Sequence, residues 1–409
     1  MNLKKFLLVG LMMMVIASFV LAQEVGVFVG TVQDTEGGPL PGVTVTAKNI
    51  QTGLTQSSIT NNQGRFRLER LPRGIYNLTA SLTGFKTLTK KEIELHSGDE
   101  LRVNFVLEVG GIEEEVTVVG EAPLVETTRA QVSTVITERE MLSYPQGNRN
   151  YLSLIQYAPG TLPGAGRSGF AINGMRGSAN NFMIDGITNN DEGLQGAAVT
   201  QLPLESIQEF RLVSSNFSAE YGRNAGGIIN AVMKSGTNEL HGSGWVFYRG
   251  DSSLFRTEDW LTHDRPPYDR WQYGGTLGGP IIKDKTFFFL TFQGTRLVQE
   301  SRTPMYFFTQ EAVAGAQGFA REVFDLLGSN YPVPTYNFKD LDGDGVNDIG
   351  QYVWDGTTRQ NVYNFGIKID HIFSEKDRIA FRWLYNYNKN VFSSAAIPGY
   401  TKNVPFVYN

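Results

Sequence analysis

The chain has 409 residues, a formal net charge of -5, 45 glycines, 12% aromatic residues and no cysteine. This length allows roughly two to four domains. The acidic balance, without any basic run, argues against a nucleic-acid partner. The glycine and aromatic contents are high for a soluble α/β enzyme and typical of a β-rich protein with many turns. Without cysteine there is neither a disulfide framework nor a lipobox cysteine to acylate.

The N-terminus, residues 1–22, is predicted to be a secretory signal peptide. Lys4 and Lys5 precede an apolar run, residues 6–21, and Ala22 ends a cleavage site. A transmembrane anchor is the alternative. The run is short for a bilayer span, however, and no stop-transfer charges follow it.

Residues 23–109 show an all-β pattern. Apolar residues alternate with polar ones, as at Val43, Val45 and Ala47, and Gly, Pro and Asn interrupt the runs at short intervals. This is typical of a small β-sandwich. Four segments resemble the carboxypeptidase regulatory-like domain, which implies a transthyretin-like sandwich with a carbohydrate-binding-like fold. They are Asp34–Val43, Gly64–Leu68, Leu71–Tyr76 and Gly84–Phe85.

Peptidase chemistry does not follow from that resemblance. The sequence contains no H-x-x-E or H-E-x-x-H zinc motif, and its four histidines are far apart: His96, His241, His263 and His371. No nucleophile and base stand together either, so the chain is not predicted to be an enzyme.

A short valine-rich segment follows, within a linker at residues 110–126. It resembles a TonB box, an extended strand outside both domains that adds to the edge of a partner's sheet through main-chain hydrogen bonds. The resemblance implies the C-terminal domain of TonB as the partner. A linker strand that packs on its own domain is the alternative, and it stays open. The candidate residues are Glu114, Glu115, Val116, Thr117, Val118 and Val119.

Residues 127–235 resemble the plug domain of TonB-dependent outer-membrane receptors, an α+β domain. An opening strand and turn are expected at 134–141 and a short helix at 149–159. The region should end in a helix at 205–209 and strands at 210–213 and 228–233. Asp-Gly suits a tight turn between two strands, and paired glycines allow close approach of two backbones. The motif residues are Asn173, Gly174, Arg176, Gly177, Asp185, Gly186, Tyr221, Gly222, Gly226 and Gly227.

From residue 236 to 409 the sequence alternates as outer-membrane strands do. Ile379, Phe381 and Trp383 fall on one face of a strand, opposite Arg382 and Leu384. A soluble β-sandwich with one solvent-exposed face is the alternative, but the many aromatic residues on the apolar face favour contact with outer-membrane lipid.

Strand periodicity lapses at 299–359, where we expect an extracellular loop with a helix at 309–328. An acidic stretch after it has the spacing of an EF-hand-like loop and predicts a structural Ca²⁺, the only cofactor expected. Gln351 stands where a bidentate Glu belongs, which weakens the site, and a solvated acidic loop is the alternative. The candidate ligands are Asp340, Asp342, Asp344 and Asp348.

Together these features predict a mainly β chain with three parts: a sandwich, an α+β plug, and antiparallel strands of an incomplete barrel. The resemblance implies an energy-coupled receptor in the outer membrane of a Gram-negative-type cell, with its N-terminal domain in the periplasm. Its ligand would be too large to pass through porins, and an oligosaccharide is favoured over a siderophore or cobalamin. A surface adhesion or signalling protein without transport is the alternative.

The family's barrels that enclose a plug are large, about 22 strands. At about 9–11 residues per strand, the sequence after Gly236 is too short for such a barrel. We therefore expect the chain to be the N-terminal part of a longer receptor.

Overall fold

The structure is a computed structural model of the chain. It describes residues 25–110, 115–119, 131–163, 170–191, 198–217, 221–222, 225–251, 267–327, 331–343, 345–375 and 377–392. The predicted signal peptide, Glu114 and Asp344 lie outside these residues. Strands dominate the described part, and the predicted mainly β fold is confirmed. None of its helices is both long and apolar enough to cross a membrane.

The chain forms two compact units. The first is drawn from Met1–Ser243, Thr276–Thr291 and Gly366–Leu384, and the second from Gly244–Gly275, Phe292–Phe365 and Tyr385–Asn409. The first unit contains the sandwich, the plug and segments of the barrel strands.

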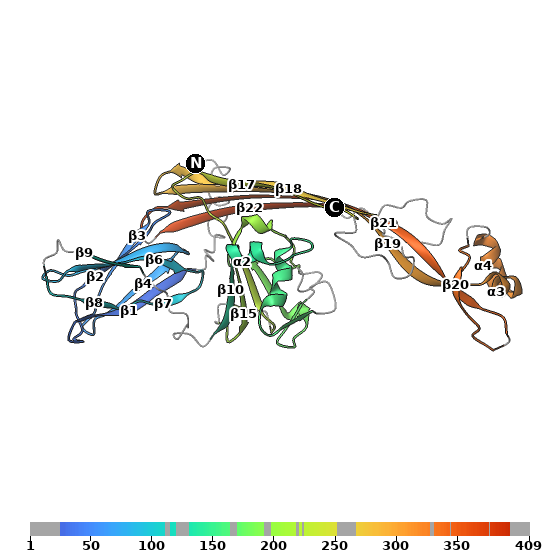
Figure 1. Cartoon of the computed structure of the whole chain (residues 1–409), viewed down its shortest axis with the longest axis horizontal. Coiled ribbons are helices and arrows are strands. Elements are labelled where there is room, and N and C mark those ends of the chain that lie inside the picture. The colour runs from blue at the N-terminus through green and yellow to red at the C-terminus, as the bar shows by residue number, and fades with distance from the viewer. Residues whose placement is uncertain are drawn as a thin grey trace, which may run out of the picture. The chain divides into compact units, whose positions relative to one another are not determined.

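The sandwich has two sheets (Figure 1). In the first sheet β1 lies between β4 and β7, and β8 also pairs with β1; in the second the order is β3-β2-β5-β6-β9. The first sheet comprises β1 (Gly26–Asp34), β4 (Arg65–Leu71), β7 (Glu100–Arg102) and β8 (Phe105–Leu107). The second comprises β2 (Thr44–Asn49), β3 (Thr55–Ile59), β5 (Gly74–Ser81), β6 (Thr87–Leu95) and β9 (Glu115–Val119).

Alternate residues of these strands fill the sandwich core. Val45 and Ala47 of β2 and Tyr76 and Leu78 of β5 are fully buried, as the period-2 pattern predicts. The Tyr76 ring meets Phe28 of β1 edge-on, with centroids 5.6 Å apart. Burial of each large apolar side chain contributes about 1.5–3 kcal/mol, so this core holds the two sheets together.

The plug is a five-stranded sheet with short helices, in the order β10-β15-β16-β13-β14 (Figure 1). Its strands are β10 (Val132–Thr137), β13 (Asn181–Ile184), β14 (Ile187–Thr188), β15 (Ile207–Ser215) and β16 (Ile228–Met233), with a separate pair β11 (Thr161–Pro163) and β12 (Phe170–Ile172). Its helices are α2 (Glu138–Ser143) and the 3₁₀ helices η1 (Tyr151–Tyr157), η2 (Gly177–Ala179) and η3 (Leu204–Ser206).

Local sequence accounts for the start of α2. The Thr137 side chain accepts a hydrogen bond from the Glu140 backbone N–H, and the Glu140 carboxylate accepts one from the Thr137 N–H. This capping box satisfies two N–H groups that the first turn leaves without helical partners. The strand and turn expected at 134–141 are therefore present, as β10 and α2.

Two predicted plug helices differ in the structure. The helix expected at 149–159 is the 3₁₀ helix η1, which buries Tyr151, Leu154 and Ile155. The helix expected at 205–209 is only the single turn η3, and β15 begins at Ile207, because apolar residues from there onward are buried in the sheet. The last plug strand, β16, has the predicted bounds.

The barrel strands form a six-stranded sheet. The order of strands in it is β17-β18-β19-β21-β20, and β22 also pairs with β21. They are β17 (His241–Arg249), β18 (Tyr268–Ile282), β19 (Thr286–Phe308), β20 (Tyr336–Lys339), β21 (Ile349–Ile372) and β22 (Arg378–Phe392).

Side-chain exposure on these strands alternates as predicted, with aromatic residues out and polar residues in. In β22, Phe381 and Trp383 are 50% and 48% exposed, whereas Lys368 of β21 is 4% exposed. Phe289 of β19 is buried and joins the apolar core of the plug, with Leu384 packed against it. An apolar outer face with a polar inner face is what lipid outside and a plug inside require.

In the second unit, the strands run farther into the expected loop at 299–359 than the sequence pattern indicated. β19 continues to Phe308 and β21 begins at Ile349. The expected helix is broken into α3 (Gln310–Gly315) and α4 (Phe319–Leu327), with Gly318 in a left-handed conformation before α4.

Candidate coupling site

The described part of the TonB-box candidate, Glu115–Val119, forms β9. This strand pairs in parallel with β6, so that Glu115 lies opposite Thr87 and Val119 opposite Lys91. The prediction of a strand outside both domains is therefore wrong: β9 is an edge strand of the sandwich. A free strand carries unpaired N–H and C=O groups, and adding to a sheet edge satisfies one row of them.

The Asp185–Gly186 motif makes the predicted tight turn between β13 and β14. Both residues have positive φ, 46° and 82°, and Ile184 pairs with Ile187 across the turn. Asp-Gly tolerates this left-handed geometry, which matches the twist of the two strands. Asp185 Oδ1 also accepts a hydrogen bond from the Met233 N–H of β16, 2.8 Å away.

Most other motif residues lie in turns of the plug or at positions where neighbouring atoms leave no room for a Cβ. Asn173 and Gly174 both have positive φ, and the Asn173 amide donates to the Ser214 carbonyl at 2.7 Å. At Gly226 and Gly227 an added Cβ would overlap atoms of neighbouring residues, including the Ala179 carbonyl and the Ile172 side chain. Arg176 and Gly177 open η2, and Tyr221, which precedes Gly222, packs against a small apolar cluster.

Asp185 also binds the barrel strands. Its Oδ2 lies 3.0 Å from Arg382 Nη1 of β22 and 3.4 Å from Lys368 Nζ of β21. Arg382 further donates to the Ile184 carbonyl at 2.9 Å, and Lys368 donates to the Met233 carbonyl at 3.2 Å. One buried carboxylate of the plug thus pairs directly with two barrel cations, and the carboxyl group of Asp370 in β21 interacts electrostatically with the same two.

A second buried charge cluster joins β15 of the plug to the sandwich. Glu209 and Arg211 are 1% and 3% exposed. Glu209 accepts a hydrogen bond from the Ser97 N–H and lies 2.8 Å from His96 Nδ1. Arg211 donates to Asp99 Oδ1 at 2.8 Å and also to the Ser97 carbonyl. The two plug charges therefore dock the loop between β6 and β7.

The charges in this cluster shift the pKa of both titrating partners. Burial alone lowers the pKa of His96, but the hydrogen bond and charge of Glu209, with the charges of Asp99 and Glu94, outweigh it and raise that pKa. Burial alone raises the pKa of Glu209, but its hydrogen bond with His96 and the nearby cations outweigh it and lower that pKa. Arg73 Nη1, 3.4 Å from Glu209, is one of those cations.

A cavity of about 450 Å³ lies in the first unit beside Asp185. Its lining includes charged groups of both signs from the plug and the barrel strands, among them Glu138, Lys234, Lys368 and Asp370. Glu138 and Lys234 pair across 2.6 Å. That pair lies within the plug, whereas Asp185 with Lys368 and Arg382 joins the plug to the barrel strands, in addition to the apolar contact at Phe289.

Sequence reasoning missed the residues that pair with Asp185 and with the two charges of β15. Glu209 and Arg211 stand two residues apart in a strand that is otherwise largely apolar, and charges at such spacing share one face. That is a usable signal. The partners His96 and Lys368 are more than 100 residues away in the chain, and no local pattern selects them.

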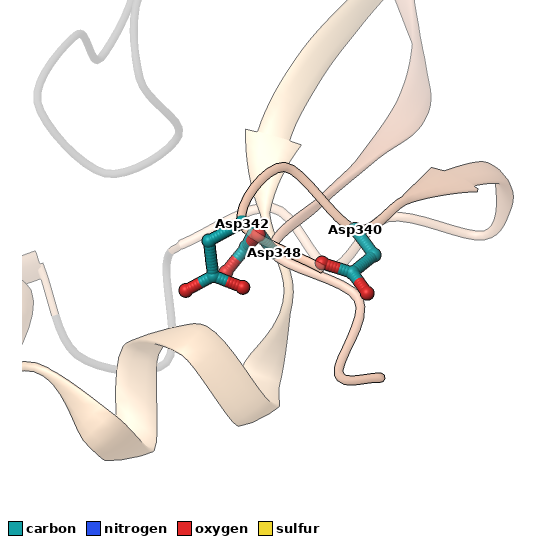
Figure 2. Close-up of side chains that lie close together, drawn as sticks. All are labelled: Asp340, Asp342 and Asp348. Carbon is teal, nitrogen blue, oxygen red and sulfur yellow. The ribbon is translucent and has the colours of Figure 1, made fainter. Parts of the chain in front are cut away.

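The acidic loop of the second unit brings together part of the predicted calcium site. Carboxyl oxygens of Asp340, Asp342 and Asp348 lie within 4.8 Å of one another, and Figure 2 shows these groups on one side of the loop. Asp340 accepts hydrogen bonds from the N–H groups of Gly343 and Gly345. These two bonds lower the pKa of Asp340.

Gln351 does not complete that loop in the manner of an EF-hand. It lies in β21 opposite Tyr336 of β20, and its side-chain oxygen accepts a hydrogen bond from the Asn337 amide at 2.6 Å. The loop is thus flanked by strands, and Asp348 is the last acidic residue of its carboxyl cluster.

Comparisons with known proteins agree with this architecture. Residues 27–108 match the Carboxypeptidase regulatory-like domain, residues 126–228 the TonB-dependent Receptor Plug Domain, and residues 232–407 the Outer membrane beta barrel domain. The chain belongs to the TonB-dependent outer-membrane receptors. These domains place the receptor in the outer membrane, with the plug facing the periplasm.

The TonB-dependent transporter Oar of Myxococcus xanthus is 32% identical over 279 residues, which cover 64% of this chain and 26% of that protein. The receptor chain thus spans about a quarter of the length of this relative. Among solved structures, the siderophore receptor PirA from Pseudomonas aeruginosa is 17% identical with a TM-score of 0.34, covering 64% of this chain and 41% of that one. The alcaligin receptor FauA from Bordetella pertussis is 13% identical with a TM-score of 0.37, covering 67% and 41%.

Replacing Asp185 with Asn should loosen the plug. The substitution keeps the size of the side chain but removes the plug carboxylate that pairs with Lys368 and Arg382. Loss of one partner of a buried pair costs about 3–5 kcal/mol, and the carboxyl group of Asp370, which interacts with the same two cations, offsets part of this cost. The urea concentration at which a protease cleaves the plug should fall accordingly. Asp325→Asn is the control, because its pair with Arg321 is exposed and should contribute about 0–1 kcal/mol. If the protease cleaves both variants at the same urea concentration, the role of Asp185 is contradicted.

Docking of the sandwich loop on β15 should depend on pH. The raised pKa of His96 stabilises docking fully below the ordinary value of 6.5, and this contribution is lost as pH rises through the raised pKa. The lowered pKa of Glu209 stabilises docking above its ordinary 4.5, a contribution lost as pH falls through the lowered pKa. Hydrogen exchange of residues 95–99, corrected for the intrinsic rate, should therefore slow in the window between.

The matched control for this pH dependence is His96→Asn, which retains a side-chain donor but does not titrate. In that variant, protection from hydrogen exchange should no longer fall at alkaline pH. The fall at acid pH, which Glu209 causes, should remain. If the alkaline loss persists, a group other than His96 causes it.

Proposed function

We propose that this receptor imports a ligand by energy-coupled transport. The ligand binds on the outer side, the C-terminal domain of TonB binds the β9 segment in the periplasm, and force from the inner membrane displaces the plug. The observation that carries the proposal is the attachment of Asp185: the plug is held to the barrel strands by ion pairs and packing. These contacts are non-covalent, so an applied force can break them and displace the plug.

The order of the plug sheet supports this mechanism. β10 is the first plug strand after β9 in the chain, and it lies at the edge of the sheet, paired only with β15 among the described strands. β15 pairs in turn with β16, whose Met233 bonds both Asp185 and Lys368. A pull on the chain before β10 thus reaches the ion pairs with the barrel through two neighbouring strands.

Transport separates this proposal from an adhesion or signalling role. Ligand uptake should stop when the proton-motive force is dissipated, whereas ligand binding at the surface should continue. Uptake that is independent of the proton-motive force would favour the adhesion alternative.

Proline at Val118 should abolish uptake and leave surface ligand binding intact. Proline removes the N–H that a strand needs for pairing, both with β6 and with a partner's sheet. The control is Ser58→Pro in β3, the opposite edge strand of the same sheet, which should not affect uptake. Labelled-ligand accumulation in cells measures the effect, and a normal rate in Val118→Pro would show that this segment is not the TonB box.

The ligand is proposed to be too large for porins, and an oligosaccharide remains the sequence-based prediction. Competition between unlabelled oligosaccharides and ferric siderophores for uptake of the labelled ligand tests that prediction directly.

We also propose that the acidic loop binds Ca²⁺. Three clustered carboxyl groups offer the hard oxygen ligands that calcium prefers, and the loop glycines allow the sharp turn around a cation. The strand position of Gln351 leaves the site without a bidentate glutamate, so binding should be weak.

Calorimetric titration of the intact protein should therefore show one weakly bound Ca²⁺. Asp342→Ala should remove this heat because it deletes one of the three carboxyl groups. Asp325→Ala, an exposed acid on α4, should leave it unchanged. No heat at millimolar calcium in the wild-type protein would refute the site.

A further inference from the structure

We propose that the sandwich acts as a latch on the TonB box: β9 must leave β6 before a pull on it can move the plug. This inference rests on the proposed function and adds a control step to it. It assigns to the carboxypeptidase regulatory-like domain a role in coupling, in place of any ligand or catalytic role.

The first observation is the pairing itself. Five residues of β9 follow β6 in parallel register, from Glu115 opposite Thr87 to Val119 opposite Lys91. While this ladder is intact, a force on β9 is transmitted to β6 and hence to the sandwich. The first plug strand, β10, lies farther along the chain and is pulled through the chain only after the ladder opens.

The second observation is that the sandwich is itself anchored, so the ladder cannot simply move with the pull. The loop between β6 and β7 is held by the buried Glu209 and Arg211 of the plug. On the barrel side, the Asn238 N–H donates to the Gln51 carbonyl at 3.0 Å, and Arg378 donates to the Arg70 carbonyl. These contacts spread the load over the plug and the barrel strands together, where it produces no relative movement.

The third observation is that β9 is weakly held in the sheet to which it belongs. It is a five-residue strand at one edge, and it pairs on one side only among the described strands, whereas β6 is paired on both sides. Parallel pairing is also slightly less stable per residue than antiparallel pairing. A partner whose strand pairs with the β9 groups now bonded to β6 can therefore replace β6 without unfolding the sandwich.

A reversible cross-link tests the latch. Thr89 and Thr117 are register partners in β6 and β9, and the chain has no cysteine of its own, so Thr89→Cys with Thr117→Cys forms a single defined disulfide. The matched control is Thr46→Cys with Ser57→Cys, which joins β2 to β3 at the opposite edge of the same sheet. Ligand uptake is measured in cells before and after oxidation, and again after reduction.

Oxidation should lower uptake at least tenfold in the Thr89/Thr117 pair, and reduction should restore it, whereas the Thr46/Ser57 pair should be unaffected. Since the same polypeptide is compared in both redox states, misfolding cannot produce this result. Unchanged uptake in the oxidised Thr89/Thr117 pair would overturn the latch. So would failure of this pair to cross-link under conditions that join Thr46 and Ser57.

The proposed function fails in a different way. If uptake by the wild-type protein does not require the proton-motive force, or if Val118→Pro transports normally, energy coupling through β9 is refuted, and the latch with it. A coupled wild-type receptor that is insensitive to the cross-link refutes the latch alone.

Discussion

The carboxylate of Asp185 is the contact on which the arrangement of plug and barrel strands depends. A buried charge is tolerated only where an opposite charge and hydrogen bonds replace water, and here each partner needs the other. If the plug turn moved away, Lys368 and Arg382 would lose the carboxylate that they contact directly, and Asp185 would lose both of its cations. The attraction is also local, because it vanishes once the groups separate and water enters. Such a contact fixes one position of the plug and still permits its displacement under force.

The Glu209 and Arg211 cluster applies the same physics to the sandwich. Two opposite charges two residues apart on β15 face a loop that presents His96, Ser97 and Asp99. A reversed or shifted docking would place like charges together, so the pair selects one orientation of the sandwich on the plug. Much of the attraction in a buried ion pair is offset by desolvation, so the pair contributes more to specificity than to stability. The sandwich is thus positioned by β15, the plug strand with which β10 pairs.

Local chemistry could be predicted from the sequence, and distant pairing could not. Asp185–Gly186 and Asn173–Gly174 were identifiable because their left-handed turns restrict the residue types that fit. The two faces of the barrel strands follow from periodicity, whereas the bounds of β16 follow from the resemblance to the plug domain. The parallel pairing of β9 with β6 leaves no such trace, since a valine-rich strand suits any free edge, whether on its own sandwich or on a partner. The η1 helix was expected as a helix, but its 3₁₀ form depends on which side chains the plug core can bury.

The strengths of the three attachments imply an order of events under load. The β6–β9 ladder is short, lies at an edge and is next to the point of pulling, so it should open first. The β10–β15 pairing comes next, because β10 is also an edge strand, whereas β15 and β16 are each paired on two sides. The ion pairs of Asp185 lie beyond both strands and should separate last. If they opened first, the plug would leave as one body. If they open last, the strands nearest the pull come away while Asp185 still holds the rest of the sheet to the barrel strands.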